Sequence, residues 1–291
     1  MITNLIDNFI DKAKSLKIGI IGETIIDEFV YVSYEGQSMK SICPAFKLSG
    51  KKEVQQGGAT AIANHLKDFV KQLDVFTNTQ SEIVKTRYVD VNDQKKHVEI
   101  NKFDTDTFKP FSINTADYDV VIVADFGHGF CDKLNITDGF HLMCQTNSNN
   151  FGFNRVSKWK KHRNKSVCID LREASLQLNK KINFSNDKEI LDLFNYELNT
   201  EHLFLTLGSK GSMYTDGKTI QRHSSFKSDI VDTIGAGDTY YAFTCVASQI
   251  YGNTEDLLKI PSLAASLSTT WLCNEQSVTK EKLKHYATRF L

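Results

Sequence analysis

Short apolar runs, each ending in or followed by a glycine, an aspartate or a threonine, most constrain what this chain can fold into. The runs are residues 17–22, 119–124, 166–170 and 202–206. Helical spacing of apolar residues marks residues 4–15, and a second helix is predicted for residues 59–70, directly after two glycines. Runs that are apolar on both faces and alternate with helices are typical of buried parallel strands. The sequence therefore predicts an α/β fold, a mostly parallel central sheet with helices on both faces.

Two other stretches alternate polar and apolar residues, as half-exposed antiparallel strands do. The expected pairs are residues 28–34 with 45–48, and residues 84–91 with 96–103. The second pair turns at Asn92 and Asp93. We expect a small antiparallel sheet that projects from the main one, with lid strands at approximately residues 28–56 and 84–104. Open α/β sheets bind ligands at the carboxyl ends of their strands, so such a sheet would serve as a lid.

Composition excludes several classes of partner. Lys plus Arg and Asp plus Glu both number 35, and this balance argues against a binder of nucleic acid or anionic membranes. No run approaches the roughly 18 uncharged apolar residues of a membrane span, and residues 1–17 do not resemble a signal peptide. The six cysteines form no C-x-x-C pair, so free thiols in a reducing cytoplasm are expected, with a disulfide framework or a zinc site as the alternative. No repeat or linker divides residues 1–291, which we interpret as one domain.

The sharpest chemical signal is the segment 231–239, Val-Asp-Thr-Ile-Gly-Ala-Gly-Asp-Thr. Gly235, Ala236 and Gly237 place unobstructed backbone N–H groups at the first turn of a helix, where an anion is favoured. Asp238, in the same turn, can accept a proton from a hydroxyl that attacks a phosphorus held by those amides. The pattern indicates phosphoryl transfer to an alcohol. The alternative is that the glycines merely turn the chain and Asp238 is a helix-start carboxylate.

The run from Asp232 to Asp238 resembles the D-T-x-G-A-G-D motif of the PfkB carbohydrate kinases, also called the ribokinase family. Further segments resemble that family's motifs in the same order: residues 22–27 (Gly-Glu-Thr-Ile-Ile-Asp), the glycine pair at 57–58, residues 170–174 (Asp-Leu-Arg-Glu-Ala, similar to N-x-x-E) and residues 206–211 (similar to T-x-G-x-x-G). The resemblance spans nearly the whole chain and implies a ribokinase-like fold. Residues 57–66, 85–87 and 124–129 look most like kinases of heptose phosphates and the kinase halves of fused sugar kinase–nucleotidyltransferase proteins.

The resemblance implies a role for each matching residue. Asp238 would deprotonate the acceptor hydroxyl, and Gly235, Ala236 and Gly237 would form the anion hole. The sugar would contact Asp27, Gly57 and Gly58, the nucleotide would lie along Thr206, Gly208 and Gly211, and Asp170 and Glu173 would orient a hydrated magnesium ion.

Other candidate residues are indicated by position. Lys85 and Arg87 alternate on one face of a lid strand, where they would grip a substrate phosphate or form a solvated face. Asp125, with His128 in a Gly-flanked turn, would reach the substrate, or His128 is a loop residue without a role.

Two matched acids also have a structural interpretation. Asp27 would then only cap a strand end, and Glu173 would be a solvated helix-start acid.

The chain departs from the family pattern at several positions. Asp170 stands where most members have asparagine, which adds a negative charge at the metal site. Ala61 occupies a position where many members have asparagine, with Asn64 three residues further on. Between Thr77 and Val84 only about six residues remain, too few for the helix–strand unit that usually follows, so we expect a reduced sheet edge.

The leading hypothesis is a carbohydrate kinase that uses ATP and Mg²⁺ to phosphorylate a hydroxyl of a sugar or sugar phosphate. A catalytically reduced sugar-binding or regulatory homologue, and a nucleoside or vitamin kinase of the same superfamily, are the alternatives. Activation by a monovalent cation stays open. We expect a homodimer through the lid, because exposed strand edges tend to be paired. A nucleotidyltransferase of the same pathway would be a separate chain.

Overall fold

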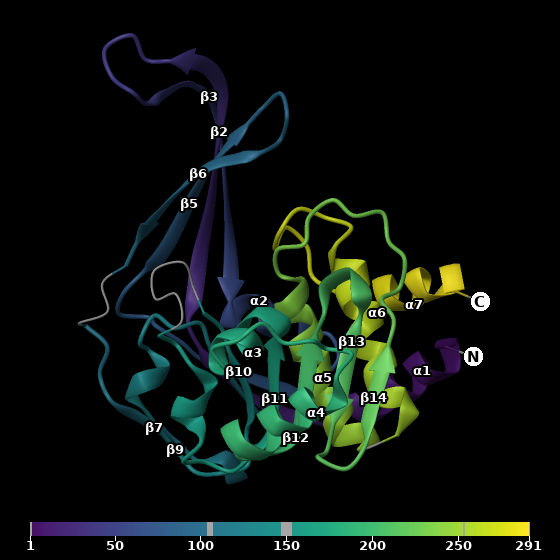
Figure 1. Ribbon diagram of the computed structural model, residues 1–291. Coiled ribbons are helices and arrows are strands. Elements are labelled where there is room, and N and C mark those ends of the chain that lie inside the picture. Colours follow the sequence, from purple (N-terminus) through teal and green to yellow (C-terminus); the bar gives the residue numbers. More distant parts are fainter. Residues whose placement is uncertain (1, 104–106, 147–152, 253, 291) are drawn as a thin grey trace.

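An eight-stranded sheet forms the body of the protein in the computed structural model, which describes residues 2–103, 107–146, 153–252 and 254–290 (Figure 1). Its strand order is β14-β13-β12-β11-β10-β8-β1-β4. The strands are β1 (Lys17–Gly22), β4 (Gln72–Phe76), β8 (Val120–Asp125), β10 (His141–Cys144), β11 (Asn164–Asp170), β12 (Thr200–Thr206), β13 (Ser212–Thr215) and β14 (Ile220–His223). In this order, every pair from β12 through β11, β10, β8 and β1 to β4 is parallel, whereas β13 pairs antiparallel with both β12 and β14. The predicted mostly parallel sheet is confirmed.

Helices cover both faces of this sheet (Figure 1). On one face α5 (Ala236–Tyr251) contacts α1 (Ile2–Ala13), α2 (Ala59–Leu66) and α6 (Lys259–Ser268), and α7 (Lys280–Ala287) packs on α1 and α6. The rings of Phe9, Phe69 and Phe243 pack together there, at centroid distances of 5.1 to 6.0 Å. The other face carries the short helices α3 (Leu171–Gln177) and α4 (Asp187–Asp192). All six side chains of β8 are buried, as its unbroken apolar run predicts.

The remaining elements are short. β7 (Phe111–Ile113) and β9 (Leu134–Ile136) form a parallel pair of their own. Single turns of 3-10 or π helix are η1 (Thr115–Asp117), η2 (Cys131–Lys133), η3 (Val156–Trp159), η4 (Leu193–Glu197), η5 (Gly208–Lys210), η6 (Glu255–Leu258) and η7 (Thr288–Phe290).

A second sheet projects from the body as a lid (Figure 1). It consists of β2 (Thr24–Gln37), β3 (Pro44–Gly58), β5 (Ile83–Asp90) and β6 (Lys96–Lys102), in the order β3-β2-β5-β6. The two hairpins are antiparallel as predicted, but the central pair β2–β5 is parallel, so the lid sheet is mixed. The path of the chain explains this direction. After β3, α2 and β4 bring the chain back to the edge of the central sheet beside β1. β5 therefore leaves the body in the same direction as β2.

The predicted shortage before the second lid hairpin is present. Residues 77–82 connect β4 directly to β5 without an intervening helix or strand, and β4 is an edge strand of the central sheet. The connection is fixed by hydrogen bonds to the start of β2, where the backbone N–H of Thr24 donates to Thr77 Oγ1 at 2.9 Å and to Asn78 Oδ1 at 2.7 Å. The second lid hairpin therefore starts beside the first.

The six cysteines are free, and Cys43 is exposed while the other five are buried. Within the described ranges, no helix combines the length and the apolar character that crossing a membrane requires.

Candidate active site

A cavity of about 920 Å³ lies between the carboxyl ends of the central strands and the lid. Its volume is in the range of sites that hold a small-molecule ligand. The predicted site residues that line it are Asp27, Gly58, Lys85, Arg87, Asp170, Glu173, Thr206, Gly208, Gly211, Gly235, Ala236, Gly237 and Asp238. The structure thus gathers residues from both sheets and from several regions of the chain that are far apart in sequence.

The start of α5 forms one wall of the cavity. Gly235 adopts a left-handed φ of 83°, and a Cβ at this position would lie 2.9 Å from Asn274 Oδ1. Glycine is therefore needed both for the turn and for the close approach. The N–H groups of the first helical turn have no intrahelical acceptor, although that of Ala236 donates to the carbonyl of Thr233 at 3.3 Å. The helix dipole makes this end favourable for an anion.

Asp238 faces the cavity from the same turn of α5. Burial raises the pKa of its carboxyl from 3.8 to about 7, and the charge of Asp27 contributes in the same direction, whereas Lys85 opposes it. A carboxylate with a pKa near neutrality can both take and release a proton at physiological pH.

A relay of hydrogen bonds holds the beginning of α5. His65, buried on α2, accepts from the backbone N–H of Val278 at Nδ1 (3.0 Å), so its Nε2 carries the proton and donates to Thr239 Oγ1 (3.0 Å). The hydroxyl of Thr239 in turn donates to the carbonyl of Gly235 at 3.0 Å. Burial, helped by Lys282, lowers the pKa of His65 to about 4 and keeps the ring neutral. No local sequence pattern marked His65, because its partners are distant in the chain.

Asp170 and Glu173 form a capping box at the start of α3. Asp170 Oδ1 accepts from the backbone N–H of Glu173 at 2.7 Å, and Glu173 Oε2 accepts from the backbone N–H of Asp170 at 2.8 Å. Burial raises the pKa of Glu173 to about 8, and the charges of Asp170 and Asp238 add to this effect. A cation is therefore favoured beside this acidic group. The oxygen donors suit Mg²⁺, which keeps part of its water shell.

The lid supplies a mixed set of charges at the other end of the cavity. In the register of the lid sheet Asp27 lies opposite Lys85. Arg87 pairs with Asp27, and its Nε donates to Glu99 Oε2 at 2.9 Å. Lys85 forms no ion pair within the part of the chain that the structure describes, and burial lowers its pKa. The Lys85 ammonium group is thus available to an anionic or hydroxyl-bearing ligand.

Two predicted substrate residues do not line the cavity. Gly57 lies behind Asp27, where a Cβ would come within 2.5 Å of Asp27 Oδ2, so it allows Asp27 to take its position. Asp125 is fully buried. Its Oδ2 accepts from Trp159 Nε1 at 2.8 Å and from Lys158 Nζ at 2.7 Å. Both partners come from η3, and no sequence pattern indicates that contact.

His128 is also buried, against the ring of Phe103 at a centroid distance of 5.3 Å. Neither ring nitrogen has a hydrogen-bond partner among the described residues. Burial and the neighbouring Lys85 lower its pKa to about 3, so the ring is neutral.

The turn after β12 opens on the cavity. The backbone N–H of Leu207 donates to the carbonyl of Gly211 at 2.8 Å, and Gly211, with φ 95°, leaves no room for a side chain because a Cβ would lie 2.0 Å from the carbonyl oxygen of His223. Phe226, Ala265 and Thr269 line the cavity beside this turn. The mixture of apolar and hydroxyl groups suits a flat ligand with polar edges.

Asn274 lines the cavity as well, although it was not predicted. Its backbone N–H donates to Gln55 Oε1 at 2.8 Å, which joins the C-terminal segment to the lid strand β3. It occupies no recognisable motif, and only the folded chain brings it beside Gly235.

Fold and cavity together define a class, that of ribokinase-like α/β proteins with a separate lid sheet. A sequence model described as "pfkB family carbohydrate kinase" matches residues 165–271. A ribokinase of Lactococcus lactis is 35% identical over 82 residues, which make up 28% of this chain and 24% of that protein. The match thus spans about a quarter of the curated relative's length.

Solved structures match over almost the whole chain. A nucleoside kinase of Methanocaldococcus jannaschii, described as an archaeal member of the ribokinase family, has a TM-score of 0.65 at 17% identity, covering 95% of this chain and 99% of that one. A ribokinase of Arabidopsis thaliana, complexed with ribose and ATP, has a TM-score of 0.60 at 14% identity, covering 94% and 98%. The solved structures show a ribokinase-like fold, as predicted, and residues 165–271 are similar to the PfkB carbohydrate kinases. The likeness to heptose-phosphate kinases stays a prediction.

Proposed function

We propose that this protein is a kinase that transfers the γ-phosphoryl group of ATP to a hydroxyl of a sugar or sugar phosphate. The observation that carries the proposal is the first turn of α5, where Asp238 and the amides of Gly235, Ala236 and Gly237 line one cavity together. The family match and the fold support a kinase. Ribose and ATP are named for the Arabidopsis ribokinase, and we extend only their chemical classes to this chain.

In the proposed reaction, Asp238 accepts the proton of the acceptor hydroxyl as its oxygen attacks the γ-phosphorus. The bond between that phosphorus and the oxygen bridging to the β-phosphate breaks, and ADP leaves with the electron pair. The amides of Gly235, Ala236 and Gly237 stabilise the charge on the transferred phosphoryl oxygens. Asp27 orients the sugar hydroxyls, while the turn from Thr206 to Gly211 holds the nucleotide.

Mg²⁺ would be held near Asp170 and Glu173, and when bound it neutralises phosphate charge. Those two side chains also fix the start of α3 through their capping box. We propose that they orient the metal through its water shell, since each already accepts a backbone N–H.

We also propose that the protein forms a homodimer through the lid. Asp27, Lys85 and Arg87 point into the cavity, so alternate residues of the same strands face away from it. In the register of the sheet, the outward residues Glu28 and Thr86 lie beside Val54, which is 58% exposed, and Ile100, which is 53% exposed. Apolar side chains on a projecting sheet favour burial against a second copy.

The test of the proposed activity is ADP release from MgATP with a panel of hexoses, heptoses, pentoses, their phosphates and nucleosides. Asp238→Asn should bind ligands nearly as well and lower kcat by roughly 10² to 10⁴, the usual effect of losing a general base. Asp229→Asn is the matched control: its side chain is 94% exposed, and kcat should stay within about twofold. If Asp238→Asn turns over as fast as the wild type, the assigned base is contradicted. If the wild type releases no ADP with any acceptor and does not bind ATP, a non-catalytic homologue is favoured.

A further inference from the structure

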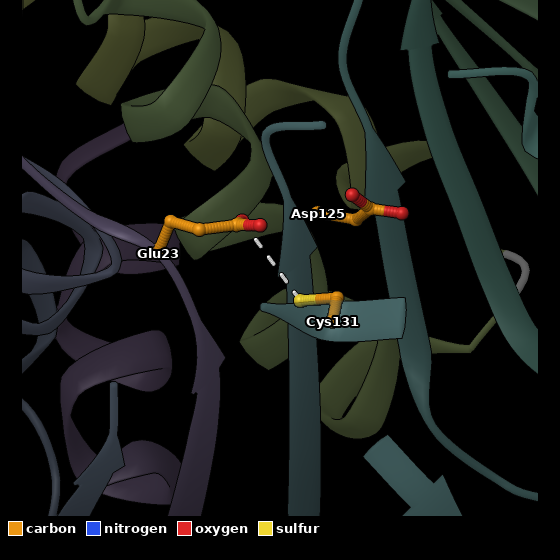
Figure 2. A group of neighbouring side chains, drawn as sticks. All are labelled: Glu23, Asp125 and Cys131. Atoms are coloured by element: carbon orange, nitrogen blue, oxygen red, sulfur yellow. Dashed lines mark hydrogen bonds between the residues drawn. The ribbon is translucent and has the colours of Figure 1, made fainter. Parts of the chain in front are cut away.

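Glu23 is a fully buried carboxylate that the proposed reaction does not use. It is the single residue between β1 and β2, and it lies close to Asp125 and Cys131 (Figure 2). Burial raises its pKa to about 7, with a further contribution from Asp125. An ionisable group at such a position is unfavourable unless its oxygens have specific partners.

Its partners show that the cluster is a hydrogen-bonded support and not a cation site. Ligand atoms of Glu23, Asp125 and Cys131 do lie within 4.8 Å of one another. However, Glu23 Oε2 accepts from the backbone N–H of Phe126 (2.8 Å) and Oε1 from that of Phe130 (3.2 Å). Both oxygens of Asp125 are occupied too: Oδ1 accepts from the backbone N–H of Gly127 at 3.0 Å, and Oδ2 accepts from the Lys158 ammonium.

The side chain of Glu23 therefore fixes both ends of the segment 126–130. Phe126 lines the cavity, whereas His128, in the middle of the segment, is buried near Lys85. Loss of this carboxylate would remove the acceptor of two buried backbone hydrogen bonds, which is costly.

The main chain of Glu23 holds a second part of the same cavity wall. Its carbonyl accepts from the backbone N–H of Ala59 at 2.9 Å, at the start of α2. Gly58, with φ 63°, packs directly on this carbonyl, because a Cβ there would lie 2.1 Å from it. The same hypothetical Cβ would lie 3.3 Å from the ring of Phe126. One residue thus joins the end of β1, the loop after β8 and the glycine turn before α2.

We propose that Glu23 is a positioning residue for the acceptor end of the cavity. It acts by holding Phe126 and Gly58 against each other, and the wall they form sets the affinity for the acceptor. The inference rests on the proposed kinase function. It assigns Glu23 no contact with the acceptor and no part in proton transfer, so its effect falls on acceptor binding and leaves kcat and the nucleotide end nearly unchanged.

The test uses Glu23→Gln in the full chain, which keeps the size of the side chain but presents an amide nitrogen to one of the two N–H groups. Asp90→Asn is the matched control, because Asp90 is also buried and accepts two backbone N–H groups, from Tyr34 and Asn92, each at 2.7 Å, without lining the cavity. We expect Glu23→Gln to raise the acceptor KM about tenfold or more, with kcat within about threefold and an unchanged KM for MgATP. Asp90→Asn should leave the acceptor KM within about twofold.

Hydrogen exchange provides a readout that does not depend on turnover. The amides of Phe126 and Phe130 should exchange about tenfold faster in Glu23→Gln than in the wild type, while those of the central strands stay unchanged. Should Glu23→Gln not fold, Glu23→Asp, which withdraws the carboxylate by one methylene, is measured in the same two assays.

The outcomes separate the two proposals. A folded variant with unchanged acceptor KM, or with equal rises in the acceptor and MgATP KM values, overturns the positioning role. Unchanged exchange at Phe126 and Phe130 overturns the hydrogen-bonded support itself. A wild-type protein that turns over no member of the panel refutes the kinase function, and the exchange measurement then decides alone whether Glu23 holds the segment.

Discussion

At the scale of single residues, the ionisation of Asp238 is set by burial and, to a smaller extent, by neighbours from the lid. Burial and Asp27 raise its pKa to about 7, and Lys85 opposes them. Asp27 is itself paired with Arg87, which leaves Lys85 as the lid cation that is free to act on Asp238. The lid therefore affects the proposed base as well as the substrate.

A pH profile tests this arrangement. As a base, Asp238 must be ionised, so kcat/KM for the acceptor should rise with pH, be half-maximal near pH 7 and level off about one pH unit higher. Lys85→Met removes a positive charge that favours the ionised form, so the same limb should move to higher pH. Lys52→Met is the control, because Lys52 is half-exposed and pairs with Glu28, and it should not shift the limb. A limb centred below about pH 6, or one that Lys85→Met leaves in place, contradicts the assignment.

At the scale of secondary-structure elements, α2 and α5 are joined by the relay through His65 and Thr239. α2 begins at the glycine pair of the acceptor end, and α5 begins at the proposed anion hole. The relay therefore fixes the two ends of the proposed reaction relative to each other.

Replacing His65 by leucine should leave the N–H of Val278 and the hydroxyl of Thr239 without their partner. We expect the free energy of unfolding, measured by urea denaturation, to fall by about 2 to 4 kcal/mol. His65→Asn, which retains an acceptor for Val278, should lose less, and His285→Leu, at an exposed position of α7, should change it by less than about 0.5 kcal/mol. A folded His65→Leu as stable as the wild type contradicts the relay.

The same residue predicts a dependence of stability on pH. The pKa of His65 is lowered from 6.5 to about 4 in the folded protein, so between these values the unfolded chain binds more protons. This contribution to stability is present above about pH 6.5 and is lost as the pH falls toward 4, and His65→Leu should remove it.

Which elements were predictable follows from where their partners lie. The long central strands were found because burial on both faces leaves unbroken apolar runs. β4 and β10 were missed: β4 is a half-exposed edge strand, and β10 has only four residues, one of them His141, whose Nδ1 bonds Ser166 Oγ at 2.7 Å. The parallel pairing of β2 and β5 was missed because strand direction is a property of the whole path of the chain.

The candidate site divides in the same way. Asp238 and its neighbours were indicated by their spacing at a helix start, and Asp170 and Glu173 by resemblance to a short motif, because both signals are local in sequence; their roles stay predictions. Glu23, His65 and Asn274 were not found, since each acts through residues far away in the sequence. Asp125 was predicted to contact the substrate because no sequence pattern indicates that Trp159 packs on it.

At the scale of the whole molecule, the projecting lid makes association testable. The wild-type protein should sediment at micromolar concentration as a dimer of 32.9 kDa subunits, and Ile100→Lys should yield monomers because it places a charge on the outer face of the lid. Val75→Lys is the control, since Val75 is 37% exposed on β4, at the edge of the central sheet and outside the lid. A monomeric wild type contradicts the proposed dimer.

The lid is attached to the body at closely spaced points. β1 passes into β2 through Glu23 alone, β3 returns at Gly58, and the two attachment points are hydrogen-bonded to each other through Ala59. The connection from β4 to β5 is hydrogen-bonded to Thr24, so a third connection between lid and body lies at the same place. A sheet held along one short line rotates most readily about that line, and closure of this lid would carry Asp27 toward or away from the start of α5.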